Sequence, residues 1–191
     1  MRTLSHGEWF TLRQQAEAHI DLSKNLAKGV LRQRPHRTRL FAHLWHEDEY
    51  AFWQQAAAAR GDGTILIVGC DSALNESAWR KDLPRAYEFE AEDSYDLYRD
   101  ELLFRLFDNW GFYDWFDTFA VWSPSGGWLS YLNNRCDIGL ISAFSQDAVV
   151  AIGALSSEIF LSLEDLQDRK SWYYLDIDPA VLESNYNFVP G

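Results

Sequence analysis

The sequence predicts an α+β fold with a mixed or mainly antiparallel sheet, flanking helices and a long N-terminal helical arm. Short apolar runs separated by turn residues recur between residues 116 and 144, which is typical of an antiparallel meander. Around them lie segments whose apolar residues recur at helical spacing. The chain has 191 residues, of which 47% are hydrophobic and 16% aromatic. That composition suffices to bury a core without disulfides or metals.

The N-terminal segment predicts a helix over residues 5–32. Ser5 and Glu8 have the spacing of a capping box, and Pro35 ends the pattern. The apolar residues between them recur near helical spacing: Trp9, Leu12, Ala16, Ile20, Ala27 and Val30. We therefore divide the chain into an N-terminal helical arm, residues 1–35, and a single α+β domain, residues 36–191. The arm can pack across that domain or against a second copy, so a homodimer through this helix is one expectation.

The next elements surround a helix that Asp48 is expected to cap. Residues 38–46 suit either a strand covered on both faces or a helix. TILIVGC, residues 64–70, is an unbroken apolar run and predicts a strand buried on both faces. If the strands on either side of the helix are parallel, they form a right-handed crossover.

The remaining elements follow from the same patterns. After a loop over residues 71–86, we expect a short strand over 86–90, a helix over 94–110, strands over 116–122, 128–132 and 137–144, a helix over 145–155, a short helix from 162, a strand over 171–175 and a helix from 178. SPSGG, residues 123–127, predicts the hairpin loop of the meander. Its glycine-rich backbone could alternatively hold an anion.

Residues 87–122 have the most unusual composition. Thirteen of these 36 residues are aromatic and ten are acidic. Aromatic rings provide contact area at protein interfaces, and carboxylates attract a basic partner. The phenylalanines and leucines are expected in the core. The partner-binding candidates that remain are Tyr95, Asp96, Tyr98, Asp100, Asp108, Trp110, Tyr113, Asp114, Trp115 and Asp117. The alternative is an acidic, solvated face over a core.

The charge is unevenly distributed along the chain. The net charge of −12 combines +3 over residues 1–60 with −15 over residues 61–191. The long acidic part would repel nucleic-acid phosphate and anionic lipid, so neither is an expected partner. The N-terminus lacks the apolar stretch of a secretory signal, which makes the cytoplasm the expected compartment.

Motifs for catalysis are weak. His43 and His46 would share one face of a helix with Asp48 nearby, which suits a metal, but a strand would point them to opposite faces. Cys70 and Cys136 lie in or beside apolar runs and are expected as buried free thiols. The chain has no dinucleotide fingerprint and no phosphate-binding loop, and no cofactor is expected.

These observations favour a small, acidic, non-enzymatic protein that binds a basic partner, in physical character like the bacterial immunity and antitoxin proteins. Such proteins block basic toxins by charge and shape. One alternative is a metal-dependent hydrolase that uses the His43, His46 and Asp48 cluster. Another is a dimeric structural or assembly module.

Overall fold

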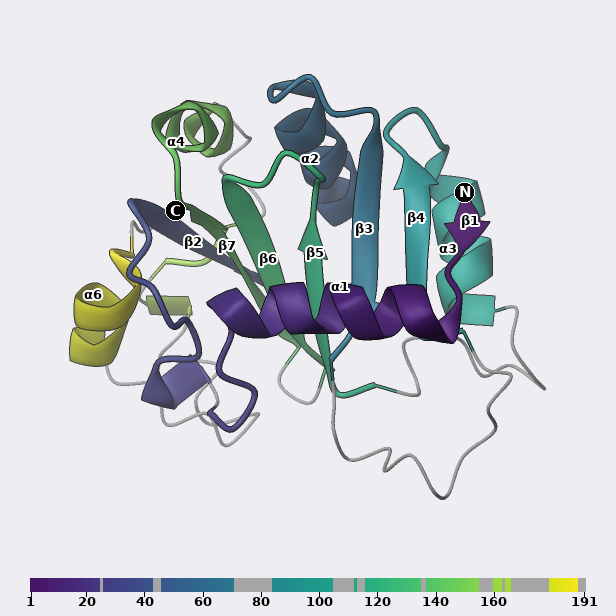
Figure 1. The fold of residues 1–191 in the computed structure, drawn as a ribbon. Coiled ribbons are helices and arrows are strands. Elements are labelled where there is room, and N and C mark those ends of the chain that lie inside the picture. The colour runs from purple at the N-terminus through teal and green to yellow at the C-terminus, as the bar shows by residue number, and fades with distance from the viewer. Residues whose placement is uncertain are drawn as a thin grey trace.

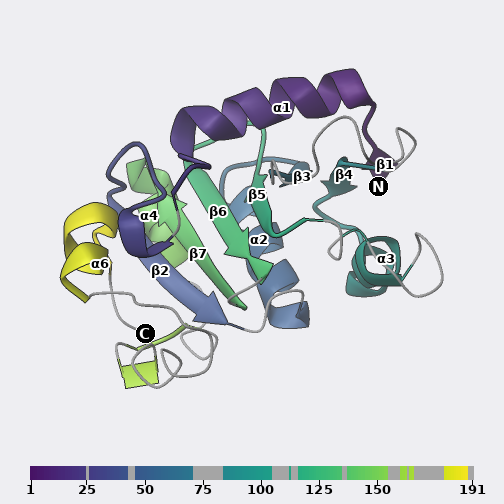
Figure 2. The same cartoon turned by 90° about the horizontal axis from the view of Figure 1, so that it is seen from below.

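The fold is α+β, with one seven-stranded sheet and helices on both of its faces (Figures 1 and 2). The computed structural model describes residues 1–24, 26–42, 46–70, 84–104, 112, 116–134, 137–154, 160–162, 164–165 and 179–188. The strands are β1 (Arg2–Thr3), β2 (Arg37–Ala42), β3 (Thr64–Gly69), β4 (Ala86–Glu90), β5 (Thr118–Trp122), β6 (Trp128–Asn133) and β7 (Ile138–Ala143). The helices are α1 (His6–His19), α2 (Glu47–Ala58), α3 (Tyr95–Arg99), α4 (Gln146–Gly153) and α6 (Pro179–Tyr186), with a 3-10 turn η1 (Leu26–Lys28) and a π-helical turn η2 (Asp100–Phe104).

The strand order across the sheet is β1-β4-β3-β5-β6-β7-β2, and every neighbouring pair is antiparallel. This confirms the predicted antiparallel meander of β5, β6 and β7. β2 and β3 run parallel, because four antiparallel pairings separate them, and α2 connects them across β5, β6 and β7 as a crossover. β2 pairs with β7 at the edge of the sheet.

Both faces of the sheet are covered. α1 runs across the strands on one face, while α2, α3 and α4 lie on the other (Figures 1 and 2). Because side chains alternate along a strand, β3 sends Leu66 and Val68 to the α1 side and Ile65 and Ile67 to the opposite side. The prediction that residues 64–70 are buried on both faces is confirmed.

The N-terminal helix begins as predicted but is much shorter than predicted. Ser5 caps it, with the Glu8 N–H donating to Ser5 Oγ and the Ser5 N–H donating to Glu8 Oε2. The helix ends at His19 after 14 residues, so the predicted helical arm over residues 5–32 is wrong.

A turn after Ile20 stops this helix. The Asp21 carboxylate accepts hydrogen bonds from the N–H and the hydroxyl of Ser23, an arrangement that competes with helical hydrogen bonding. The chain then folds back, and Leu31 pairs with Ile20 in an antiparallel bridge. Part of the apolar pattern therefore continues past the helix, although the backbone does not remain helical.

α1 is packed onto the sheet. Trp9 and Ala16 are buried beneath it, and the indole N–H of Trp9 donates to the Gly69 carbonyl at the end of β3 at 3.0 Å. On the same face, the Tyr186 hydroxyl of α6 donates to the Leu26 carbonyl at 2.7 Å. It also accepts from the Val30 N–H at 2.8 Å. The segment that follows α1 and the last described helix thus meet over the same half of the core.

One edge strand of the sheet is very short, and the other is partly covered by further backbone. β1 contributes two residues beside β4. At the opposite edge, the Leu161 N–H donates to the Leu40 carbonyl and the Thr38 N–H donates to the Asn187 carbonyl. Segments near the C-terminal end therefore cover much of the outer side of β2.

Helix starts were partly predictable. The predicted cap at Asp48 is wrong, since α2 begins after His46 and Asp48 lies in its first turn. Ser94 caps α3 as expected, but the backbone changes to π-helical geometry at Asp100, and the remainder of the predicted helix lies outside the described residues.

The other predicted elements have similar outcomes. The helices predicted from 145 and from 178 are confirmed as α4 and α6. The strand predicted over 171–175 lies outside the described residues. Cys70 is a buried free thiol as predicted, and Cys136 lies outside the described residues. Within the described ranges, the helices are too short or too polar to cross a lipid bilayer.

Candidate functional site

Half of the predicted partner-binding residues fall in the described part of the chain. Tyr95, Asp96 and Tyr98 lie on α3, Asp100 begins η2, and Asp117 precedes β5. The others lie outside the described residues: Asp108, Trp110, Tyr113, Asp114 and Trp115.

The start of α3 is held in place by α2 and by the N-terminus. The Gln54 amide donates to the carbonyls of Ala91 at 2.8 Å and Asp93 at 2.9 Å. The Tyr50 hydroxyl donates to the Asp93 carbonyl at 3.2 Å, and the Met1 ammonium group lies 2.9 Å from the Asp93 carboxylate. These bonds orient the backbone that leads into Ser94, so the first turn of α3 has a defined position relative to α2.

Tyr98 is buried, which corrects the expectation that its ring lies on the surface. It stacks on Tyr50 with ring centroids 4.3 Å apart and meets Trp53 and Phe89 edge-on. Burial raises the pKa of the Tyr98 hydroxyl well above its ordinary value, and the nearby Glu49 carboxylate adds to the rise. Tyr98 therefore joins α3 to α2 and the sheet, and it is not available to a partner in this conformation.

Tyr95 lies at the boundary between this core and the surface. Its ring is partly buried, 5.8 Å from Tyr98. Burial raises the pKa of its hydroxyl; Arg99 opposes the rise, and Glu47, Glu49 and Asp96 add to it. Carboxylates from α2 and α3 thus act on the same phenol.

The charged residues around Tyr95 are mostly acidic and exposed. The side chains of Asp96 and Asp100 are 77% and 62% exposed, and Arg99 lies between them, 3.1 Å from each carboxylate. Glu47 is exposed on the first turn of α2. We name Glu47, Tyr95, Asp96, Arg99 and Asp100 the Tyr95 surface. It is an aromatic ring surrounded by carboxylates, with one cation between two of them.

Asp117 is not part of the Tyr95 surface. β4 leads into α3 from Glu90, which pairs with Thr64 at the start of β3. Asp117 precedes β5, whose Phe119 pairs with Gly69 at the end of β3. The length of β3 therefore separates Asp117 from the start of α3, although the sequence places both in one acidic segment.

Two of the three residues of the alternative metal site lie in the described part of the chain. His46 and Asp48 are exposed at the start of α2, and His43 lies outside the described residues. In the ranges that the structure describes, no three His, Cys, Asp or Glu side chains are grouped to hold a metal ion.

The hairpin loop between β5 and β6 does hold a carboxylate, and it belongs to the chain itself. The Asp62 side chain accepts from the Ser125 N–H at 3.2 Å and from the hydroxyls of Ser123 and Ser125 at 2.6 and 2.5 Å. Ser123 also accepts from the Trp128 indole N–H at 3.0 Å. Asp62 thus takes the donors that an external anion would need.

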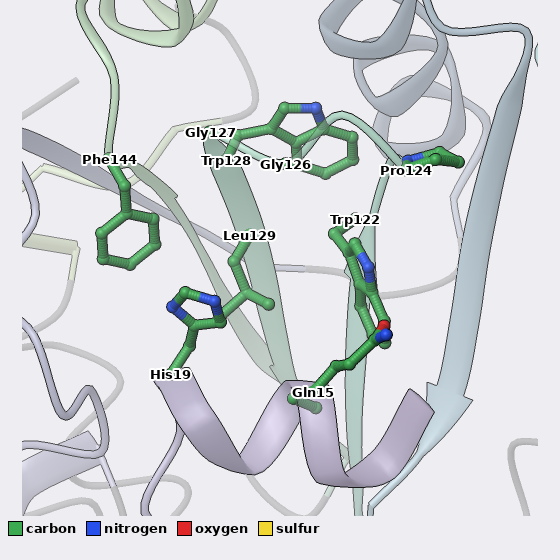
Figure 3. A pocket seen from close by; sticks show the side chains of 10 residues that line it. Gln15, His19, Trp122, Pro124, Gly126, Gly127, Trp128, Leu129 and Phe144 are labelled. Carbon is green, nitrogen blue, oxygen red and sulfur yellow. The ribbon is translucent and has the colours of Figure 1, made fainter. Parts of the chain in front are cut away.

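A cavity of about 280 Å³ lies between α1 and this hairpin (Figure 3). Its lining residues are Gln15, Ala16, His19, Trp122, Pro124, Gly126, Gly127, Trp128, Leu129 and Phe144. Sequence analysis missed this group, because α1 and the hairpin are about a hundred residues apart in the chain. The only sequence signal was that Gln15 and His19 have the i, i+4 spacing that places two side chains on one face of a helix.

Comparison with protein-family models, with curated proteins and with solved structures finds no match to this chain.

Proposed function

We propose that this protein binds a basic protein partner through the Tyr95 surface, as an inhibitor of the bacterial immunity or antitoxin type. The observation that carries the proposal is the partly exposed Tyr95 ring, which lies among carboxylates supplied by two different helices. Tyrosine is among the residues that dominate binding energy at interfaces, and surrounding carboxylates select a partner of opposite charge.

The charge of the whole chain supports the same type of partner. The net charge of −15 over residues 61–191 produces a negative field that accelerates encounter with a cation-rich surface. The hydrogen bonds from Tyr50 and Gln54 hold the start of α3 before any partner arrives. Such pre-organisation lowers the entropic cost of binding.

Charge reversal on the Tyr95 surface tests the proposal. The full chain is immobilised and used at low salt to capture a partner from an extract of its source cells. Binding of the purified partner is then measured by calorimetry. Asp96→Lys with Asp100→Lys should weaken binding at least about tenfold and reduce its salt dependence, since exposed charges control long-range attraction.

The matched control is Asp147→Lys with Glu164→Lys. It makes the same change of net charge at exposed positions outside α2 and α3. A partner that binds both double variants equally would contradict a site at the Tyr95 surface. Failure to capture any saturable basic partner would contradict the proposal as a whole.

The proposal involves no catalytic step and no cofactor, and it implies the cytoplasmic location expected from the sequence. Dimerisation through α1 stays a separate prediction. Trp9 and Ala16 of that helix are covered by the sheet, while Phe10 is 46% exposed. Light scattering of wild type and Phe10→Ser would reveal a dimer that depends on this exposed ring.

A further inference from the structure

The cavity between α1 and the β5–β6 hairpin has one wall from the helix and the others from the sheet and the loop (Figure 3). Trp122 and Leu129 come from adjacent strands and are 8% and 4% exposed. The Gly126 and Gly127 backbone closes one end, with both residues at positive φ. The hydrogen bonds that the Ser123 and Ser125 hydroxyls donate to the Asp62 carboxylate hold that loop in place. The cavity is therefore bounded by regular elements and by a braced turn.

Aromatic groups form much of the lining. Trp122 and Phe144 contribute rings, and the imidazole of His19 lies 5.5 Å from the Phe144 ring at a tilt of 41°. Aromatic rings prefer offset or tilted contacts with other rings, so these walls suit a flat, unsaturated ligand.

The polar groups are concentrated on α1. Gln15 and His19 are four residues apart, and Figure 3 shows both side chains extending from the helix toward the strands. In the part of the chain that the structure describes, neither side chain makes a hydrogen bond. An amide and an imidazole can each donate and accept, so one edge of the cavity can recognise a polar group on a ligand.

Charge is lacking among the residues that line the cavity. None of the ten is Asp, Glu, Lys or Arg. An ionised ligand would lose hydration on entry without meeting an opposite charge, which is costly. A volume of about 280 Å³ lies near the lower end for small-molecule sites and suits a molecule of one or two fused rings.

We propose that this cavity is a binding site for an uncharged aromatic or heteroaromatic molecule of one or two rings, with a hydrogen-bonding edge that faces Gln15 and His19. The site is independent of the Tyr95 surface, because it lies on the α1 face of the sheet while α2 and α3 lie on the other (Figure 2). Charge reversal at Asp96 and Asp100 should leave it unchanged.

Three probes with one ring system test the ligand class. Indole is neutral, tryptamine carries a cation and indole-3-acetate carries an anion at pH 7. Each is titrated into the full chain and followed by ligand-observed NMR. Indole should bind saturably. Both charged analogues should bind at least about tenfold more weakly, because the lining offers no opposite charge to either of them. Equal binding of all three probes, or no saturable binding of indole, would overturn the proposal.

Two matched substitutions test the location. Gln15→Trp fills the cavity from an exposed helical position and should reduce indole affinity at least about tenfold by occupying the ligand's place. Gln14→Trp makes the same chemical change one residue earlier, outside the cavity lining, and should leave affinity unchanged. Circular dichroism confirms that both variants fold. If Gln15→Trp fails to fold, His19→Ala at another exposed position should still lower indole affinity severalfold, and an unchanged affinity would contradict the site.

Discussion

The hydroxyl of Tyr186, in the last described helix, donates a hydrogen bond of 2.7 Å to the carbonyl of Leu26. The same hydroxyl accepts from the Val30 N–H at 2.8 Å, and the Tyr186 side chain is fully buried. Two backbone groups of the N-terminal segment, 156 and 160 residues away in sequence, thus depend on one phenol.

Removal of this hydroxyl should destabilise the fold. Tyr186→Phe keeps the ring but leaves the Val30 N–H and the Leu26 carbonyl without that partner. The Leu26 carbonyl still accepts from the Gly29 N–H at 3.3 Å. The free energy of unfolding should therefore fall by about 1–3 kcal/mol, the cost of one buried polar group left unpaired. Urea unfolding measures this change.

The control for Tyr186→Phe is Tyr50→Phe. The Tyr50 hydroxyl makes one longer hydrogen bond, 3.2 Å to the Asp93 carbonyl. Tyr50→Phe should therefore lower the free energy of unfolding by less than Tyr186→Phe does. An equal or larger loss of unfolding free energy from Tyr50→Phe would show that the two hydrogen bonds of the Tyr186 hydroxyl do not stabilise the fold more than a single one.

Stability should decline in alkaline solution partly because of the same residue. Burial raises the pKa of Tyr186 to about 12, whereas the unfolded phenol titrates near its ordinary value of about 10. Between these values the unfolded chain loses the proton and the folded chain keeps it. The stabilisation is complete below about pH 10 and falls as pH rises toward 12, by up to about 3 kcal/mol.

The alkaline prediction is checked by urea unfolding of wild type and Tyr186→Phe between pH 8 and 11. The wild type should lose stability more steeply in the upper half of this range. Parallel curves for the two proteins would exclude Tyr186 as the titrating group.

Replacement of Gly139 in β7 should destabilise the fold for steric reasons. A Cβ on Gly139 would collide with the Phe41 ring of β2, and both residues lie on neighbouring strands. Gly139→Ala should therefore destabilise by about 1–3 kcal/mol through overpacking. At Gly63 the same substitution would meet no atom within 4 Å, and it should be neutral or slightly stabilising. Thermal unfolding of both variants provides the comparison, and equal melting temperatures would contradict the steric argument.

Arg39 should lower the stability of the fold. It is 5% exposed, its guanidinium lies 3.6 Å from the Phe160 ring centroid, and its Nε has no hydrogen-bond partner among the described residues. Burial lowers the pKa of Arg39, and the neighbouring Arg37 lowers it further. Arg39→Met keeps apolar contact with Phe160 and removes the buried charge. It should raise the free energy of unfolding by about 1 kcal/mol, as often follows when a buried ion is replaced by an apolar residue.

Arg39→Ala is the companion variant, since it removes the charge and also the packing on Phe160. It should be less stable than Arg39→Met. Chemical denaturation measures both, and a loss of 2 kcal/mol or more for Arg39→Met would mean that the guanidinium stabilises the fold.

The meander and several helix starts could be predicted because their signals are local. Ser5, Ser94 and Ser145 each cap the helix that follows, and SPSGG turns between β5 and β6. The end of α1 was missed because apolar spacing continues past it into Val30, which is buried by other contacts. The spacing of Asp21 and Ser23, which predicts a turn, was a stronger signal for the helix end than the apolar spacing was for its continuation.

The non-local features could not be derived in this way. β2 and β3 are consecutive in the chain, but β2 pairs with the much later β7. Beneath the Tyr95 surface, Tyr98 and Leu102 are both buried and four residues apart. That spacing marks them as one inward face and could have removed Tyr98 from the candidates. Nothing in the sequence connects Glu47 with Tyr95, because their proximity depends on how α2 packs beside α3.

The two edges of the sheet limit how another protein can bind. β-augmentation requires a strand with free N–H and C=O groups along its outer side. At β2 the backbone groups of Thr38 and Leu40 are already bonded to Asn187 and Leu161, and β1 offers a ladder of two residues. A partner that binds as proposed would therefore recognise side chains at these two edges, and the shape and charge of those side chains would determine its specificity.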